Sequence, residues 1–288
     1  MQKSTTNEQE AFLRVDEVFT FRDDTVKEGW ERTILLMSDI HLDNPHCRRD
    51  LVAKHLDEAR ALNAKVFSIG DLFCAMGGKF DPRRSKSDVR PENNNDRYLD
   101  SLVHNNYRFL QPWADLFWLI TDGNHETSIR SHNETDLTAR LAEKLGCHRG
   151  GYSGFVRFLF SQDNEGHRTQ RRFYFHHGAG GGGEVTKNIG RANRQAVWVP
   201  DADILAGGHV HYSWDTPVVR VRCSDKGRVY LDEQIHIQLA TYKDEFTLRG
   251  GYHLEGGRPP KPLGGYWLKF YYRPDRLGNV GIRVYRAD

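Results

Sequence analysis

The sequence has few of the features that mark secreted, membrane-spanning and zinc-ribbon proteins. Its 288 residues include only four cysteines, and no two of them form a CxxC pair. It has no apolar run near the roughly 20 residues that a membrane-spanning helix needs. The first stretch, MQKSTTNEQEAF, also lacks the apolar segment of a secretory signal. We therefore expect reduced thiols, a cytoplasmic location and no membrane partner.

A charge excess of either sign is also missing. The 41 Lys and Arg residues nearly balance the 39 Asp and Glu residues, which leaves a net charge of +2. This balance gives no general attraction to nucleic acid, although a local basic groove remains compatible with it. By contrast, 38% of the residues are hydrophobic and 14 are histidines. The chain can form a core, and it is rich in the commonest metal-ligating side chain.

Strand-like and helix-like segments alternate in the first half of the chain. Strands are predicted at residues 33–41, 65–71 and 115–126, and amphipathic helices at 47–62, 97–113 and 135–146. Gly146 is placed to end the last of these helices. This alternation is typical of an α/β fold whose first strands are parallel.

The second half of the chain is rich in strands. They are predicted at residues 155–161, 171–178, 202–211, 218–223, 228–240, 265–273 and 280–286, with the first two forming a hairpin. Neither an internal repeat nor a low-complexity linker separates the halves. We therefore predict a single domain over 31–288, β-rich from about residue 214. An extension over 1–30 precedes it and contains a short strand at 18–22.

Side chains that can ligate metals follow five of the predicted strands. In chain order these are Asp39 and His41, then Asp71, then Asn124, His125 and Glu126, then His176 and His177, and finally His209 and His211. A period of two places Asp39 and His41 on one face of an extended segment. Open α/β sheets bind ligands at the carboxyl ends of their strands, so we expect all five groups to meet in one site.

The chemistry of these side chains indicates which ions they would bind. Carboxylate, imidazole and amide groups without thiolate suit manganese, iron or zinc in a reactive site rather than a structural zinc site. Seven ligands drawn from these ten side chains exceed the needs of one tetrahedral ion and fit two ions that share a carboxylate. Two ions about 3.5–4 Å apart can hold the attacking and leaving oxygens of a displacement at phosphorus. The sequence therefore predicts two divalent transition-metal ions, with manganese preferred over iron or zinc.

The ordered series DxH, GD, GNHE, a histidine at a strand end and GHxH resembles that of the calcineurin-like metallophosphoesterases. The resemblance spans roughly residues 33 to 213. It implies a two-sheet αββα sandwich, in which mixed sheets are flanked by helices. It also implies hydrolysis of phosphodiesters, and of phosphomonoesters as a further substrate class, by water that the metals activate. The tail that begins at Thr241 is similar to phage-type and prophage-type members.

The resemblance also implies a role for each matching residue. Asp39, His41 and His211 hold the first ion, Asn124, His209 and one of His176 and His177 hold the second, and Asp71 bridges the two. His125 faces the phosphate as a general acid or hydrogen-bond donor, and Glu126 orients it. Of the tandem histidines, His177 fits members with His-Gly at this point and His176 those with His-His-Pro. His177 is preferred.

One departure from the family pattern narrows the activity. After Gly70 and Asp71 the chain continues LFCAMGG, without the acidic and arginine-bearing signature of the phosphoprotein phosphatases. This argues against a Ser/Thr protein phosphatase.

Two polar segments lie between the motifs. The insert at 77–96 carries Arg83, Arg84, Lys86 and Arg90 and almost no apolar residue, so it is predicted to be either a mobile lid that recruits polyanions or a solvated loop. A glycine-rich stretch begins at Gly178, and its backbone is either a phosphate-binding loop or a flexible connector. The pair Arg191 and Arg194 is a candidate for binding further phosphates.

Three functions remain open on the sequence. The leading one is a phosphoesterase whose substrate is nucleotide-like or a nucleic acid. The second is a DNA nuclease of the repair-exonuclease type, although the chain lacks a coiled-coil extension and a basic charge balance. The third is a phosphate-binding protein without turnover, which the presence of Asn124 and His125 disfavours. The sequence indicates no oligomeric state.

Overall fold

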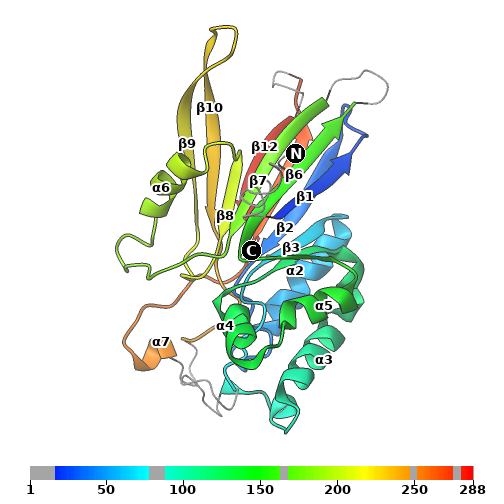
Figure 1. Ribbon diagram of the computed structural model, residues 1–288, viewed down its shortest axis with the longest axis vertical. Coiled ribbons are helices and arrows are strands. Elements are labelled where there is room, and N and C mark those ends of the chain that lie inside the picture. Colours follow the sequence, from blue (N-terminus) through cyan, green and yellow to red (C-terminus); the bar gives the residue numbers. More distant parts are fainter. Residues whose placement is uncertain (1–16, 78–87, 163–167, 247–251, 275–279, 288) are drawn as a thin grey trace, which may run out of the picture.

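Two six-stranded sheets pack face to face, and helices cover their outer faces (Figure 1). The computed structural model describes residues 17–77, 88–162, 168–246, 252–274 and 280–287. Each sheet contains both parallel and antiparallel pairs. The predicted fold class, a sandwich of mixed sheets flanked by helices, is confirmed.

The first sheet has the order β12-β11-β2-β3-β4-β5. Its strands are β2 (Glu31–Met37), β3 (Lys65–Ile69), β4 (Phe117–Thr121), β5 (His148–Gly150), β11 (Tyr266–Tyr272) and β12 (Val280–Arg286). The strands from β2 to β5 are parallel, as the strand–helix alternation predicts. The outer face is covered by α2 (Arg49–Ala61), α3 (Tyr98–Leu110) and α5 (Leu137–Leu145), whose apolar sides form one core with it.

The second sheet has the order β1-β6-β7-β8-β10-β9. Its strands are β1 (Glu17–Asp23), β6 (Ser153–Ser161), β7 (Arg168–His176), β8 (Ile204–Gly207), β9 (Trp214–Cys223) and β10 (Val229–Gln238). The predicted hairpin is the antiparallel pair β6–β7, whose turn lies outside the described residues. The helix α6 (Gly190–Trp198) lies beside β8 and β9, and the short α7 (Tyr252–Glu255) follows β10.

Aromatic side chains fill the space between the sheets. Phe67 of the first sheet stacks on Phe158 of the second, with ring centroids 6.1 Å apart. Phe158 also packs against Phe270, with centroids 4.7 Å apart. These rings are buried, and each aromatic pair adds about 0.5–1.5 kcal/mol to the effect of burial alone. This core fixes one sheet against the other, and so fixes where their strand ends meet.

The predicted amino-terminal boundary is wrong. β1 pairs in parallel with β6 along its whole length, and Phe21, Val26 and Trp30 are buried in the core between the sheets. The described part of the sandwich therefore begins at Glu17 and not at residue 31. The short strand predicted at 18–22 lies within β1.

Apolar periodicity predicts some of the helices correctly and misses others. α5 ends as predicted at Gly146, which adopts the left-handed backbone (φ 69°) of a helix C-cap. By contrast, the predicted strand over 115–126 covers two elements, because β4 ends at Thr121 and the helix α4 (Asn124–Asn133) starts three residues later. The sequence analysis misses both α4 and α6; in α4 a polar composition weakens the helical period.

All four cysteines are free. Among the described residues, no helix has the length and apolar character required to cross a membrane.

A buried carboxylate ties the amino-terminal strand to the sandwich and allows a stability test. Asp23 accepts hydrogen bonds from Thr25, Trp30 and Arg32, the last at 2.5 and 2.8 Å. Burial alone raises the pKa of Asp23, but the bonds from Thr25 and Arg32 outweigh it and lower that pKa. Asp23→Asn is expected to lower the free energy of unfolding at pH 7 by about 1.5–3 kcal/mol, the range for hydrogen bonds to charged groups.

Urea denaturation over a range of pH checks this prediction. The folded pKa lies below the unfolded one, so the difference between the two proteins should be complete above pH 3.8, the ordinary value. It should shrink as the pH falls through the folded pKa. The control is Asp50→Asn, which breaks an exposed pair with Arg48 and should cost less than about 1 kcal/mol. Equal losses in the two variants would contradict the assignment.

Candidate metal centre

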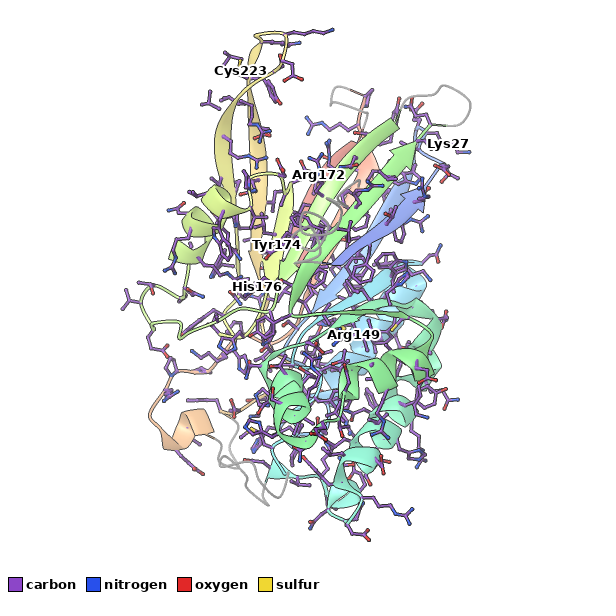
Figure 2. The ribbon with its side chains drawn as sticks, viewed as in Figure 1. Lys27, Arg149, Arg172, Tyr174, His176 and Cys223 are labelled. Atoms are coloured by element: carbon purple, nitrogen blue, oxygen red, sulfur yellow. The ribbon has the colours of Figure 1, made fainter. Side chains whose placement is uncertain are left out.

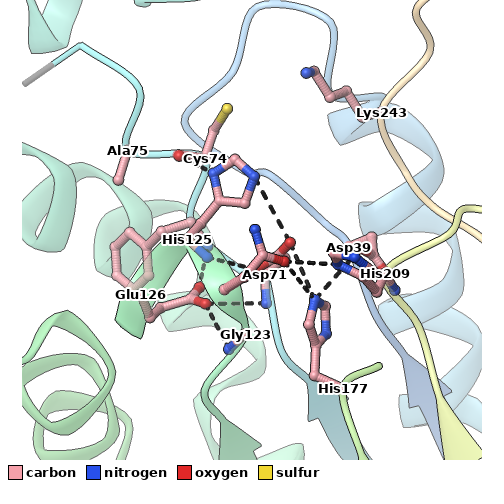
Figure 3. Close-up of polar contacts among 12 residues, drawn as sticks. Asp39, Asp71, Cys74, Ala75, Gly123, His125, Glu126, His177, His209 and Lys243 are labelled. Carbon is pink, nitrogen blue, oxygen red and sulfur yellow. Dashed lines mark hydrogen bonds and ion pairs between the residues drawn. The ribbon is translucent and has the colours of Figure 1, made fainter. Parts of the chain in front are cut away.

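Five loops, three from one sheet and two from the other, meet at a single point. The residues that follow the strands are Asp39 and His41 after β2, Asp71 after β3, Asn124 and His125 after β4, His177 after β7, and His209 and His211 after β8. Figure 3 shows polar contacts among residues around this point, with Asp71 and His177 near the centre. The strand ends of both sheets face the same way, so the sandwich brings together residues that are up to 172 positions apart in the chain.

Two groups of three potential ligands lie side by side. Asp39, His41 and His211 form one group, and Asp71, His177 and His209 form the other; in each, the ligand atoms lie within 4.8 Å of one another. His211 Nε2 is 3.1 Å from Asp39 Oδ1, and His177 Nε2 is 3.2 Å from Asp71 Oδ2. The groups adjoin, since His177 Nε2 is also 4.0 Å from Asp39 Oδ1.

The side chain of Asn124 completes the second group. Its Oδ1 lies 2.8 Å from His209 Nδ1 and 3.2 Å from His177 Nε2. Two imidazoles and an amide oxygen thus converge within reach of the Asp71 carboxylate. Oxygen and nitrogen donors of this kind are the ligands that manganese, iron and zinc accept in reactive sites.

The charges in the site are strongly coupled. Burial alone raises the pKa of Asp71, but the neighbouring His177, His125 and His41 outweigh it and hold this pKa well below its usual range. Burial, together with the charge of His125, holds the pKa of His41 well below its usual range. Asp71 is therefore a carboxylate and His41 a neutral imidazole, which are the protonation states that metal binding requires.

His177 shows the need for a cation most directly. Burial alone lowers its pKa, but the carboxylates of Asp71 and Asp39 raise it to about 10. In the protein without metal, a proton on His177 therefore balances these two negative charges. Metal ions between the carboxylates would take over this role and release the proton.

Ring nitrogens without hydrogen-bond partners, as well as charge, indicate that the site fits metal ions. His41 is only 2% exposed, and neither of its ring nitrogens has a hydrogen-bond partner in the described part of the chain. A buried imidazole without a partner is costly, because it has lost its hydrogen bonds to water. An ion held by Asp39, His41 and His211 would remove this cost.

The backbone of the ligand loops is unusual. Asp39 (φ 49°), His41 (φ 48°) and Asp71 (φ 50°) all adopt the left-handed region, as do both histidines after β8. Residues other than glycine rarely occur there, and each costs roughly 1–3 kcal/mol. The expectation that Asp39 and His41 share one face of an extended strand is therefore wrong, because β2 ends at Met37. The two side chains meet through left-handed turns and not along an extended strand.

At two positions in the motifs only glycine fits, because a neighbouring ligand loop lies too close for a side chain. A Cβ on Gly123 would overlap the carboxylate and backbone nitrogen of Asp71. A Cβ on Gly208 would overlap Ser38 and the carboxylate of Asp39. The glycines in GNHE and GGHVH therefore allow one ligand loop to lie directly on another.

The structure places His177, and not His176, in the cluster. His177 is fully buried and its ring faces Asp71. His176 lies on the other face of β7 with Tyr174, where its ring is near Trp198 of α6 (Figure 2). The alternation of a strand sends neighbouring residues to opposite faces, so only one of the pair can reach the site.

Glu126 does not orient the ring of His125, although the resemblance implies that it does. The Glu126 carboxylate does not bond to the ring of His125; it accepts hydrogen bonds from the backbone N–H groups of Asp71, Phe73 and Gly123 at 2.8–3.1 Å. The ring of His125 is oriented instead by the carbonyl oxygen of Cys74, which lies 2.5 Å from Nδ1. Its Nε2 points toward Asp71, 3.8 Å from Oδ2.

Two residues at the site are missed by the sequence analysis. Asp43 is buried and accepts hydrogen bonds from the N–H groups of Cys74 and Ala75, so it shapes the loop after β3. The Asp43 carboxylate in the DxHxD spacing is a signal for this role. Lys243 lines the pocket with a side chain that is 11% exposed, and it pairs with Glu245 at 2.7 Å. No motif surrounds Lys243, so only the tertiary structure reveals it.

The cluster opens into a pocket of about 600 Å³. His41, Asp71, Asn124, His125, His209 and His211 form its floor. Three glycines of the stretch after Gly178 line one wall, and Lys243, Arg258 and Lys261 contribute positive charge. The glycine-rich stretch thus borders the pocket.

Met76, directly before the insert at 77–96, and Asp88 within it line the pocket. The carboxyl end of the insert packs against the domain: Arg90 donates to the carbonyl oxygens of Asn44 and Cys47, and Asn93 is fully buried. Arg90 is therefore not placed to recruit polyanions. The other three cations of the insert, Arg83, Arg84 and Lys86, lie outside the described residues.

The arginine pair of α6 does not line the pocket. The guanidinium of Arg191 lies against the backbone of Gly178 and Gly207, and burial lowers its pKa to about 10. Arg194 is exposed. The pair is therefore not placed to bind a phosphate in this pocket.

Comparisons with known proteins return structural matches only. No family model matches the sequence, and no curated protein matches it significantly. Vps29 from Entamoeba histolytica, complexed with Zn²⁺, is 11% identical with a TM-score of 0.38, over 88% of this chain and 98% of that one. A conserved uncharacterized protein, a predicted phosphoesterase, from Streptococcus pneumoniae is 11% identical with a TM-score of 0.31, over 90% and 99%.

A third solved structure is longer than this chain. The putative 5′-nucleotidase from Staphylococcus aureus is 14% identical with a TM-score of 0.41, over 88% of this chain and 53% of that one. At identities and TM-scores this low, the function has to be argued from the residues of the site.

The glycine contacts give a direct test of the site. Gly123→Ala is expected to lower the affinity for Mn²⁺ at least tenfold, because the added methyl group displaces the Asp71 carboxylate. Isothermal titration calorimetry measures this affinity. The control is Gly190→Ala in α6, where a Cβ meets nothing within 4 Å. Unchanged affinity in Gly123→Ala, with a folded protein by circular dichroism, would refute the assignment.

Proposed function

We propose that this protein is a metal-dependent phosphoesterase of the calcineurin-like type, which hydrolyses phosphodiesters with two divalent ions, manganese first. The observation that carries the proposal is the pair of adjoining three-residue groups, one of which contains Asp71. Asp71 lies within reach of His177 and His125 and accepts the backbone N–H of His125 at 3.0 Å. One ion alone would leave one of the two groups without a cation.

The residues would divide the work as follows. Asp39, His41 and His211 hold one ion, and Asn124, His177 and His209 hold the other, with Asp71 shared. When bound, the two ions supply an activated water and neutralise charge on the phosphate. The protein holds the substrate over this floor and keeps its own ligands buried, where electrostatic interactions are strong.

His125 is the proposed proton donor. It lines the pocket, and the carbonyl oxygen of Cys74 fixes its ring through Nδ1, so that Nε2 faces the cavity floor. A hydrogen bond or proton from Nε2 to a phosphate oxygen or to the leaving group would lower the barrier. Groups that act in this way contribute typically about 10²–10⁴-fold.

The pocket favours the phosphate part of the substrate. Lys243 places a mostly buried positive charge in the lining of the pocket, which also contains Arg258 and Lys261. Apart from histidines, none of the lining residues in the described part of the chain is aromatic, so a base would find no ring to stack on there. We therefore propose small phosphodiesters as substrates, ahead of single-stranded DNA. The intact His125 disfavours a phosphate-binding protein without turnover.

Metal dependence is the first test. Protein loaded with Mn²⁺ and desalted is expected to retain two ions per chain by elemental analysis. A chelator should abolish hydrolysis of bis(p-nitrophenyl) phosphate, and Mn²⁺ should restore it. The same assay with p-nitrophenyl phosphate, cyclic nucleotides and single-stranded DNA ranks the substrate classes. At most one bound ion would refute the two-metal proposal.

Two substitutions separate metal binding from turnover. Asp71→Asn is expected to lose both ions, because it removes the charge that they share, whereas Asp88→Asn at the pocket rim should retain them. His125→Ala should retain both ions and lose about 10²–10⁴-fold in kcat, the usual contribution of an acid–base group. The matched control is the exposed His132→Ala of the same helix. Loss of a metal in His125→Ala would assign that residue as a ligand instead.

A further inference from the structure

A thiol lies next to the candidate centre but belongs to neither of its two ligand groups. Cys74 follows Asp71 by three residues in the loop after β3, and it is 1% exposed. Its Sγ, one ring nitrogen of His41 and one of His125 all lie within 4.8 Å of one another. Figure 3 shows Cys74 beside His125, with Lys243 nearby. The proposed phosphoesterase makes no use of this thiol.

Both histidines of this group are prepared to act as ligands. Because the Nδ1 of His125 donates its proton to the carbonyl oxygen of Cys74, Nε2 carries a lone pair in the neutral ring and a proton only in the imidazolium form that would act as donor. Metal-binding histidines are held by this type of hydrogen bond in most proteins. His41 is buried, and both of its ring nitrogens lack a hydrogen-bond partner in the described part of the chain.

Two groups beside Cys74 would stabilise a thiolate once a bound metal has displaced its proton. Asn44 Nδ2 donates a hydrogen bond to Sγ at 3.3 Å, and Lys243 supplies a positive charge nearby. The backbone N–H of Cys74 is held by Asp43 at 2.7 Å, which fixes the position of the side chain. Burial raises the pKa of Cys74 to about 12, so the free thiol is protonated. A bound transition metal deprotonates such a thiol and releases one proton to solvent.

We propose that Cys74, His41 and His125 form a second metal site, which binds one thiophilic divalent ion such as Zn²⁺ or Cd²⁺. One thiolate and two imidazoles are a ligand set typical of zinc, with a fourth position open toward the pocket. Manganese prefers oxygen ligands and is not expected to use the thiol. The site therefore distinguishes between metals that the two-ion centre alone would accept.

The two arrangements exclude each other because they share residues. An ion at Cys74 takes His41 from the first ion of the proposed centre and ties up the proposed proton donor His125. Excess zinc is thus expected to inhibit the manganese-loaded protein. This consequence rests on the proposed function, whereas the binding of the ion at Cys74 does not.

The binding test uses Co²⁺ and Cd²⁺ as probes. Titration of the metal-free protein should produce a thiolate-to-metal charge-transfer band in the ultraviolet. Cys74→Ser should lose the band, and Cys47→Ser should retain it. Cys47 is a matched control, because it is also buried and burial raises its pKa to about 12 as well. Asp71→Asn, which disables the proposed two-ion centre, should retain the band.

The outcomes separate the two proposals. An unchanged band in Cys74→Ser, or no band in the wild-type protein, would overturn the Cys74 site. If Cys74→Ser does not fold, ¹¹³Cd NMR of the wild-type protein decides, since a sulfur ligand shifts the resonance strongly downfield from that of an ion with oxygen and nitrogen ligands only. A band without hydrolysis of any phosphate ester would support the site and count against the phosphoesterase.

Inhibition of hydrolysis by zinc tests the functional consequence of the Cys74 site. Each manganese-loaded protein is titrated with Zn²⁺ and compared with its own rate before zinc. Cys74→Ser is expected to raise the half-inhibitory zinc concentration at least about tenfold, the lower end of what disturbing a metal ligand shell costs. Cys47→Ser should behave as the wild type. Equal inhibition of all three proteins would show that zinc acts elsewhere.

Discussion

The buried carboxylate of Glu126 holds together the loops on which the candidate centre depends. It accepts N–H groups from Asp71 and Phe73 of the loop after β3, and from Gly123 at the start of α4. Burial and the charge of Asp71 raise the pKa of Glu126, and the N–H groups of Phe73 and Gly123 act against them. Without these bonds the two loops would separate, and Asp71 would lose its position relative to Asn124 and His125.

The second constraint is that the loops of the two sheets must touch. His209 donates its backbone N–H to the Asp39 carboxylate at 2.9 Å, and Tyr242 donates to the Asp39 carbonyl oxygen at 3.0 Å. Such contacts require glycine where a side chain would intervene and left-handed backbone where the chain must turn sharply. Strain in the ligand loops is thus offset by the large apolar core between the sheets.

Local patterns predicted the elements that have a clear period or a clear end signal. Alternating strands and amphipathic helices gave β2, β3, α2, α3 and α5 close to their observed bounds. The pattern failed at α4, because the first turn of that helix consists of the site residues themselves, whose polarity reads as the end of a strand. The strand at β1 was predicted but was assigned to an extension outside the domain, since a lone strand shows its burial only once β6 lies beside it.

The sequence by itself determined which side chains are available and at which strand ends they lie: Asp39, Asp71, Asn124, a histidine of the tandem pair, and His209 with His211. Only the tertiary structure decided that His177 faces the cluster, that Glu126 binds backbone and not His125, and that Cys74 and Lys243 lie beside it. The reason is physical. Motif spacing fixes the order of residues along the chain. The directions in which their side chains point are fixed by left-handed turns and by contacts between the two sheets. These turns and contacts depend on residues that are far apart in the sequence.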